Sequence, residues 1–121
     1  MEEFGIDKYV TETIVIMPDS VELRRLLWFL LGGTRGGENR ARIISHLKER
    51  PSNLNQLAKQ MGVEYRAVQH HIEVLQRNSL VVSSGEKYGV TYLLTPWLES
   101  NYGVFEEICR KLNFDLKGGS A

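Results

Sequence analysis

The sequence of 121 residues has one cysteine, three prolines and no long hydrophobic run. A single cysteine excludes an internal disulfide framework and suits a reducing cytoplasm. The longest apolar run, "LLWFLL" at residues 26–31, is far too short to cross a membrane. The opening residues "MEEFGID" lack the basic start of a secretory signal. These features predict one compact cytoplasmic protein without a membrane segment.

The formal net charge is zero, but the charges are unevenly distributed. Residues 1–20 carry five acidic side chains and one lysine, a balance of −4. Residues 34–92 carry nine Lys or Arg and five Glu, a balance of +4, together with all three histidines. A basic middle segment beside an acidic arm favours an anionic partner for the middle segment.

The N-terminal third is expected to form a strand and an apolar helix. "TETIVIM" at residues 11–17 is rich in β-branched residues and predicts a short strand that Pro18 ends. Asp19 and Glu22 have the spacing of a capping box, so a helix is expected over residues 20–31. The second half of this helix is apolar on every side, which predicts burial all round, against its own chain or a second one.

The middle of the chain predicts three short helices and a hairpin. Apolar periodicity indicates a helix over residues 38–48. Asn53 is expected to cap a second helix, and Gly62 to turn the chain into a third helix over residues 64–78. Two β-rich runs around a glycine turn follow at residues 80–95. This order of elements is that of a winged helix-turn-helix, so the expected fold class is α+β, mainly α.

Three parts are therefore expected along the chain. Residues 1–33 form an N-terminal arm, a short strand and an apolar helix. Residues 34–95 form the winged helix-turn-helix as a DNA-binding domain. Residues 96–121 form a final helix, with Pro96 in its first turn and a kink at Gly103, followed by a frayed tail.

The segment "GGTRGG" at residues 32–37 invites comparison with phosphate-binding loops. A Walker loop needs Gly-Lys-Ser/Thr after a strand, whereas here an arginine lies between glycine pairs after a predicted helix. A connector between helices is the favoured interpretation, and no cofactor is expected.

Two adjacent histidines lie on the third helix. His70 and His71 point about 100° apart, so they cannot bind one metal ion together. His70 and Glu73 have the spacing of a metal pair, but no third ligand follows, and no metal site is expected. His71 lies beside the buried stripe and is expected to be half-buried, with a ring nitrogen that bonds a neighbouring backbone group. His70 shares a polar face with Arg66 and Gln69, whose side chains can pair with guanine and adenine edges.

The block "VEYRAVQHHIEVLQRNSLV" resembles the recognition-helix region of ArsR-like winged-helix transcription regulators. With "GGTRGG" upstream, the chain is similar to an archaeal branch with T-R-G-G and H-H motifs, and the resemblance covers residues 32–95. It implies base contacts from Tyr65, Arg66, Gln69 and His70. It implies phosphate or wing contacts from Arg35, Arg40, Asn55, Gln56, Arg77, Lys87 and Tyr88. Metal-sensing members carry a cysteine pair in the second helix, which "NLNQLAKQM" lacks, so the resemblance does not imply metal sensing.

The expected assembly is a homodimer on double-stranded DNA, with the third helix in the major groove and the hairpin as the wing. Apolar residues of the first and last helices are expected at the dimer interface: Leu27, Trp28, Phe29, Leu31, Trp97, Phe105, Ile108 and Leu112. The alternative is a monomer whose N-terminal arm folds back over this surface.

Two other functions compete with DNA-binding regulation. A winged-helix module that binds protein predicts weak, salt-sensitive DNA binding without sequence preference, and the basal transcription machinery is one partner that the class admits. An enzyme is not expected, because the sequence offers no nucleophile with a paired base, no metal cluster and no cofactor loop.

Overall fold

The computed structural model describes residues 20–85 and 89–116. The helices of this part are α2 (Ser20–Leu27), the π-helix η1 (Trp28–Gly32), α3 (Gly37–Glu49), α4 (Leu54–Met61), α5 (Tyr65–Arg77), α6 (Pro96–Ser100) and α7 (Tyr102–Leu112). Strands β2 (Val81–Ser84) and β3 (Thr91–Leu94) pair antiparallel, with Val81 opposite Leu94. The fold is a mainly α winged helix-turn-helix, which confirms the predicted class. The predicted strand at residues 11–17 lies outside the described residues.

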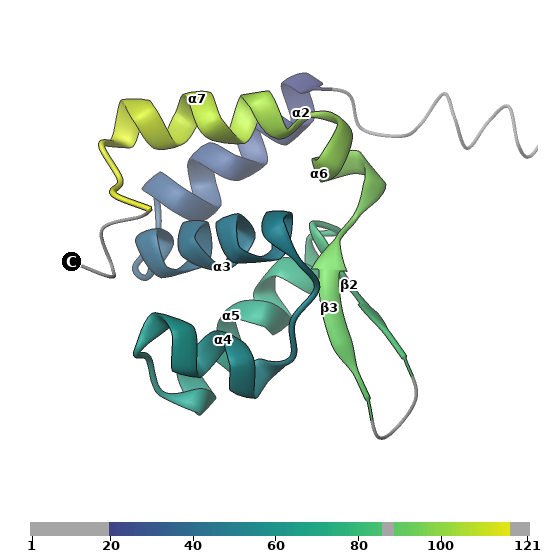
Figure 1. The fold of residues 1–121 in the computed structure, drawn as a ribbon. Coiled ribbons are helices and arrows are strands. Elements are labelled where there is room, and N and C mark those ends of the chain that lie inside the picture. The colour runs from purple at the N-terminus through teal and green to yellow at the C-terminus, as the bar shows by residue number, and fades with distance from the viewer. Residues whose placement is uncertain (1–19, 86–88, 117–121) are drawn as a thin grey trace, which may run out of the picture.

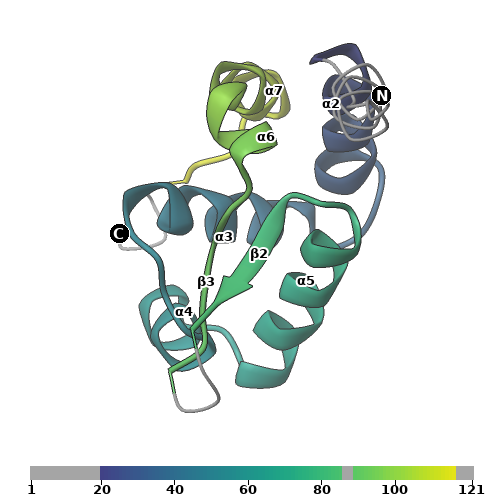
Figure 2. The ribbon, with the colours of Figure 1, turned by 90° about the vertical axis from the view of Figure 1, so that its right-hand side faces the viewer.

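Helix α3 lies between two groups of elements (Figure 1). Helices α2, η1 and α7 lie on one side of it, and α4, α5 and the hairpin lie on the other, as the turned view also shows (Figure 2). Helix α7 packs on α2 and η1, while α3 contacts η1, α4, α5 and β3. The flanking helices are therefore continuous with the winged unit.

One hydrophobic cluster runs through both groups of elements. The apolar face predicted for α3 is buried as expected, with Ile43 and Ile44 fully inaccessible. Full burial of one such side chain contributes about 1.5–3 kcal/mol before entropy is counted. The largest fully buried side chains come from both sides of α3: Phe105, Leu23, Leu27, Ile43, Ile44, Leu57, Ile72, Leu75, Leu80, Leu98, Ile108 and Val68.

Apolar residues of the first and last helices are buried by other partners than expected. Four residues predicted at a dimer interface are buried within the chain: Leu27, Leu31, Phe105 and Ile108. The prediction was wrong for these four because α2, η1 and α7 pack against one another, so the chain itself covers them. Trp28, Trp97 and Leu112 are half-buried, whereas Phe29 is 60% exposed.

Two helices also differ in form from their prediction. The last turn of the first helix, Trp28–Gly32, has π geometry. The final helix is split in two at Asn101, whose side-chain amide donates to the Trp97 carbonyl at 2.9 Å. Such a bond competes with the helical backbone pattern and ends the helix there. Gly103, the predicted kink, lies inside α7.

Candidate nucleic-acid interface

The helix-turn-helix is formed by α4, the turn at Gly62 and α5. Asn53 caps α4 as predicted: its side chain accepts from the Gln56 N–H at 2.8 Å, and the Gln56 side chain accepts from the Asn53 N–H at 2.8 Å. Gly62 ends α4 with φ +67°, a left-handed conformation that glycine adopts without a steric penalty. The turn then places α5 beside α4 (Figure 1).

Helix α5 has one buried face and one exposed face. Val68, His71, Ile72 and Leu75 are buried. The exposed side chains are Tyr65, Arg66, Gln69, His70, Glu73 and Arg77. The four residues for which base contacts were predicted therefore lie together on the exposed side of its first half, because positions four apart are neighbours on a helix. Arg77 lies in the last turn of the helix.

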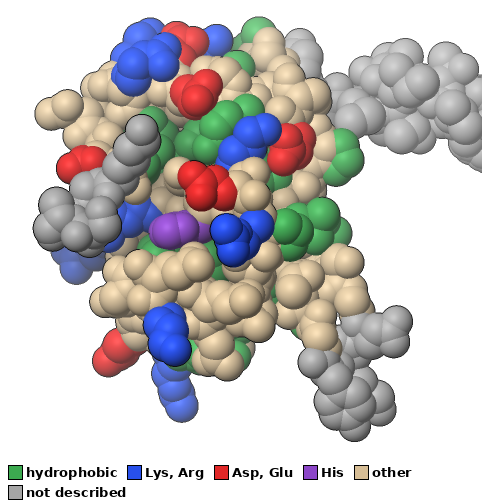
Figure 3. Space-filling model, viewed as in Figure 1, with side chains coloured by type: hydrophobic (Ala, Val, Ile, Leu, Met, Phe, Trp, Pro, Cys, Tyr) green, Lys and Arg blue, Asp and Glu red, His purple; other side chains and the backbone are tan. Residues whose placement is uncertain are grey.

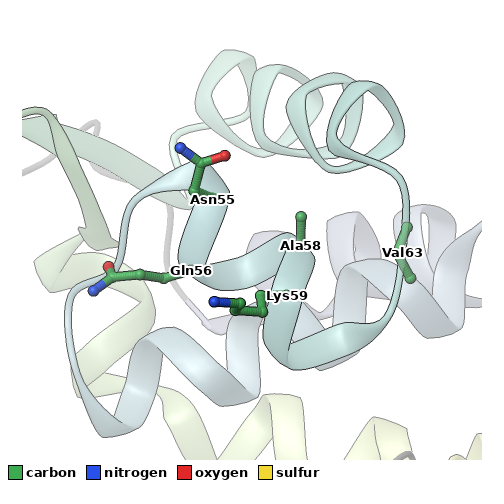
Figure 4. A pocket seen from close by; sticks show the side chains of 5 residues that line it. All are labelled: Asn55, Gln56, Ala58, Lys59 and Val63. Carbon is green, nitrogen blue, oxygen red and sulfur yellow. The ribbon is translucent and has the colours of Figure 1, made fainter.

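The start of α4 borders an open groove of about 510 Å³ next to the helix-turn-helix. Its lining residues are Asn55, Gln56, Ala58, Lys59 and Val63. Asn55 and Ala58 point from α4 toward α5, and Val63 lies on the connecting turn (Figure 4). Lys59 is a cation that the sequence prediction missed, although it follows Asn55 by one helical turn on the same polar face.

The hairpin is attached to the residue that precedes the α4 cap. The Ser52 N–H donates to the Tyr92 carbonyl at 3.1 Å, and the Tyr92 N–H donates to the Ser52 carbonyl at 2.8 Å. This isolated bridge adds a third short extended segment to the two strands. Lys87 and Tyr88, the predicted wing contacts, lie outside the described residues.

Arg40, a predicted phosphate contact, is buried and only 4% exposed. Its Nε and Nη2 donate to the Leu30 carbonyl at 3.0 and 2.7 Å, and Nη2 also bonds the Thr34 hydroxyl and the Arg35 carbonyl. The prediction was wrong because Arg40 precedes Ile44 by one turn and so falls on the buried face of α3. Arg35, by contrast, is exposed.

His71 is buried, whereas a half-buried position was expected, and its partner is a side chain rather than the expected backbone group. Its Nδ1 lies 3.2 Å from Arg40 Nη1. A guanidinium only donates, so Nδ1 is the acceptor and the ring proton sits on Nε2. Burial, then the Arg40 charge and then His70 lower the pKa of His71 below 6.5. His70 is exposed.

The face of the molecule seen in Figure 3 carries charges of both signs. Two ion pairs join elements of the fold: Arg24 of α2 to Glu107 of α7 at 2.9 Å, and Lys48 of α3 to Glu99 of α6 at 2.9 Å. Cys109 is buried, which raises the pKa of its thiol to about 12, so it packs rather than reacts.

Across residues 20–85 and 89–116, no cluster of three or more His, Cys, Asp or Glu is placed to hold a metal ion. Nor is any helix of those ranges long and apolar enough to span a membrane.

The fold defines a class of protein: residues 20–85 and 89–116 form a winged helix-turn-helix. Residues 34–93 match the family model described as "Methanogenesis regulatory protein FilR1, N-terminal domain", so this part of the chain is similar to that regulator domain. No curated protein matches the chain.

Solved structures show the same fold at low sequence identity. The transcriptional regulator HlyU from Vibrio vulnificus is 16% identical, with a TM-score of 0.54 over 89% of this chain and 98% of its own. The homodimeric winged helix-turn-helix DNA-binding domain of Mb0332 from Mycobacterium bovis is 12% identical, with a TM-score of 0.56 over 81% and 91%. A MarR family protein from Bacillus stearothermophilus is 17% identical, with a TM-score of 0.53 over 93% and 79%.

Proposed function

We propose that this protein is a sequence-specific regulator that binds double-stranded DNA as a homodimer, with α5 in the major groove. The observation that carries the proposal is the exposed face of α5, where Arg66 and Gln69 stand between Tyr65 and His70. Arginine can donate two hydrogen bonds to a guanine edge, and glutamine can both donate to and accept from an adenine edge, so this face has the chemistry of direct readout.

The elements beside α5 supply contacts to the DNA backbone in this proposal. Asn55 and Lys59 border the open groove along α4, and the N-terminal end of α4 favours anions. Arg35 and Arg77 are exposed cations that extend the contact. The hairpin acts as the wing, with Lys87 and Tyr88 as its contacts. Phosphate contacts set the position of α5 on the duplex, and base contacts set its preference.

A homodimer would place two copies of α5 about one DNA turn apart. The surface proposed for the partner is centred on Phe29, the exposed apolar side chain of η1, with half-buried Trp28 beside it. The homodimeric state of the Mycobacterium bovis domain, which shares the fold, is consistent with this arrangement.

Selection of bound sequences from random duplex DNA tests the proposal. A palindromic motif is expected, with half-site centres about 10–10.5 base pairs apart. The matched control is the Arg66→Ala, Gln69→Ala double variant, which should recover no motif while it keeps its fold. Enrichment no better than this control would overturn the proposal. Weak binding that salt abolishes, without any motif, would instead favour a protein-binding module.

A further inference from the structure

The T-R-G-G and H-H motifs meet in one buried cluster around Arg40. We call it the Arg40 cluster: Arg40 of α3 with its partners Leu30, Thr34, Arg35 and His71. The guanidinium binds the carbonyl of Leu30 in the middle of η1, the connector through Thr34 and Arg35, and the imidazole of His71 in α5. One side chain thus links η1, the connector, α3 and the proposed recognition helix.

The backbone of the connector is also in close contact with these elements. Gly36 has φ +85°, and a Cβ there would lie 2.7 Å from His71 Cε1. A Cβ on Gly37 would lie 1.9 Å from the Leu31 carbonyl oxygen. Both glycines are therefore required for the connector to fit between η1 and the His71 ring, and this close packing leaves the Arg40 cluster little room to rearrange without moving α5.

We propose that the Arg40 cluster positions α5 relative to η1, and that a proton on His71 releases it, so that DNA affinity falls in acid. Arg40 and His71 are positioning residues in this proposal, because neither lies on the exposed face of α5. The proposal rests on the DNA-binding function proposed above.

The geometry of the cluster explains why a proton on His71 should lower DNA affinity rather than raise it. Neutral His71 accepts from Arg40, whereas a second ring proton would fill Nδ1 and place two cations 3.2 Å apart in a buried site. The charged groups that act on His71 are Arg40 from α3 and His70 from α5, while η1 and the connector face the cluster with carbonyl oxygens. Burial keeps His71 neutral at pH 7, so the release belongs to the pH range below 6.5.

His70 is the neighbour of His71 and is exposed on the face proposed to contact bases. The effect of His71 is therefore measured in a His70→Asn background, in which position 70 is the same in every variant compared. Below the pKa of His71, affinity should then fall by about tenfold per pH unit, because binding requires the release of one proton.

The first experiment measures the dissociation constant of the selected duplex from pH 7.5 to pH 5. His70→Asn should lose affinity in acid, whereas His70→Asn, His71→Asn should not, because an asparagine oxygen accepts from Arg40 but does not titrate. At pH 7.5 the two variants should agree within a few-fold. The control pair His70→Asn, His46→Asn changes a histidine of α3 outside the cluster and should keep the full loss. Equal acid losses with and without His71 would overturn the proposal.

The second experiment needs no DNA and separates this proposal from the function on which it rests. Amide hydrogen exchange of α5, corrected for intrinsic exchange rates, is compared at pH 7.5 and pH 5. Protection should fall in acid in the wild-type chain and stay constant in His71→Asn. A chain that binds no duplex would refute the DNA-binding function alone. Protection of α5 that does not change with pH in the wild-type chain would refute the role of the cluster.

Discussion

Arg40 and Arg66 are the same residue type with opposite surroundings. Both were predicted to contact DNA, yet Arg40 is 4% exposed and Arg66 lies on an exposed helix face. Helical spacing could have separated them, because Arg40 falls one turn before Ile44 on the apolar stripe of α3. The partners of Arg40, however, come from a connector without periodicity. Spacing therefore predicts burial, whereas only the three-dimensional structure identifies the bonds.

Substitution of the exposed arginine and glutamine of α5 should affect binding and leave folding intact. Arg66→Ala and Gln69→Ala should each lower affinity for the selected duplex by about 1–3 kcal/mol and relax base preference, because each loses contacts to base edges. Titrations against the selected site and its single-base variants measure both effects. Arg110→Ala, an exposed arginine of α7, removes the same charge elsewhere. If Arg66→Ala weakens binding no more than Arg110→Ala, the assignment of the α5 face is wrong.

The two adjacent histidines should separate stability from binding. His71→Ala should lower the free energy of unfolding by about 1–3 kcal/mol, because the buried Arg40 guanidinium loses an acceptor. His70→Ala should change stability little and lower DNA affinity instead. Paired melting and binding curves at pH 7.5 check both, and the reverse pattern would interchange the two roles.

Acid should also reduce the stability of the chain through His71. Its pKa in the folded state lies below its unfolded value of 6.5, so its contribution is complete above pH 6.5. Between 6.5 and the folded pKa only the unfolded chain binds the proton, and the contribution is lost as pH falls. Denaturant unfolding from pH 7.5 to pH 5 measures this loss, and His71→Asn should reduce it. An identical pH dependence in His71→Asn would assign the loss to other groups.

At the scale of elements, the sequence predicted correctly those caps, turns and strands that have a local signal. The Asn53 cap, the Gly62 turn and the hairpin are as expected, since each depends on a few neighbouring residues. The π turn of η1 and the split at Asn101 were not predicted. The first involves the Leu30 carbonyl, which accepts from Arg40 ten residues away, and the second a side-chain bond that spacing does not reveal.

Asn53 and Asn55 offer a matched test at the start of α4. Asn53→Ala should destabilise the protein by about 1 kcal/mol, because the first turn loses its cap. Asn55→Ala should leave stability within about 0.5 kcal/mol, since it is exposed, and should weaken binding to all duplexes alike. Denaturant unfolding and titrations on two unrelated duplexes separate the outcomes. Equal loss of stability in both variants would contradict the capping argument.

For the whole molecule, the sequence predicted the amount of apolar surface in the flanking helices but not what covers it. A three-helix unit with a hairpin buries a marginal core, which made a partner chain the expected cover. Much of that cover instead comes from α2, η1 and α7 packing together above α3 (Figure 1). Such contacts join segments eighty residues apart, and a single sequence carries no signal for them.

Phe29→Glu should yield a folded monomer that binds half-sites poorly. Phe29 is 60% exposed, so the charge reaches water in the monomer and is buried only in the proposed dimer. Sedimentation at micromolar concentration measures the mass. Val82→Glu, at another exposed apolar position, should sediment with the same mass as the wild-type chain. Leu27→Glu, at a fully buried one, should instead abolish cooperative melting. A wild-type chain that sediments at 13.9 kDa would refute the dimer.

The bridge between Ser52 and Tyr92 consists of main-chain atoms only. These two hydrogen bonds therefore do not depend on which side chain stands at position 92, proline excepted, since it would remove a donor. The other attachment of the hairpin is through the buried Val81 and Leu94, so the exposed residues of β2 can vary without loss of either attachment. A library that randomises the exposed residues of β2 should retain the scaffold in most members, and selection could then act on DNA preference alone.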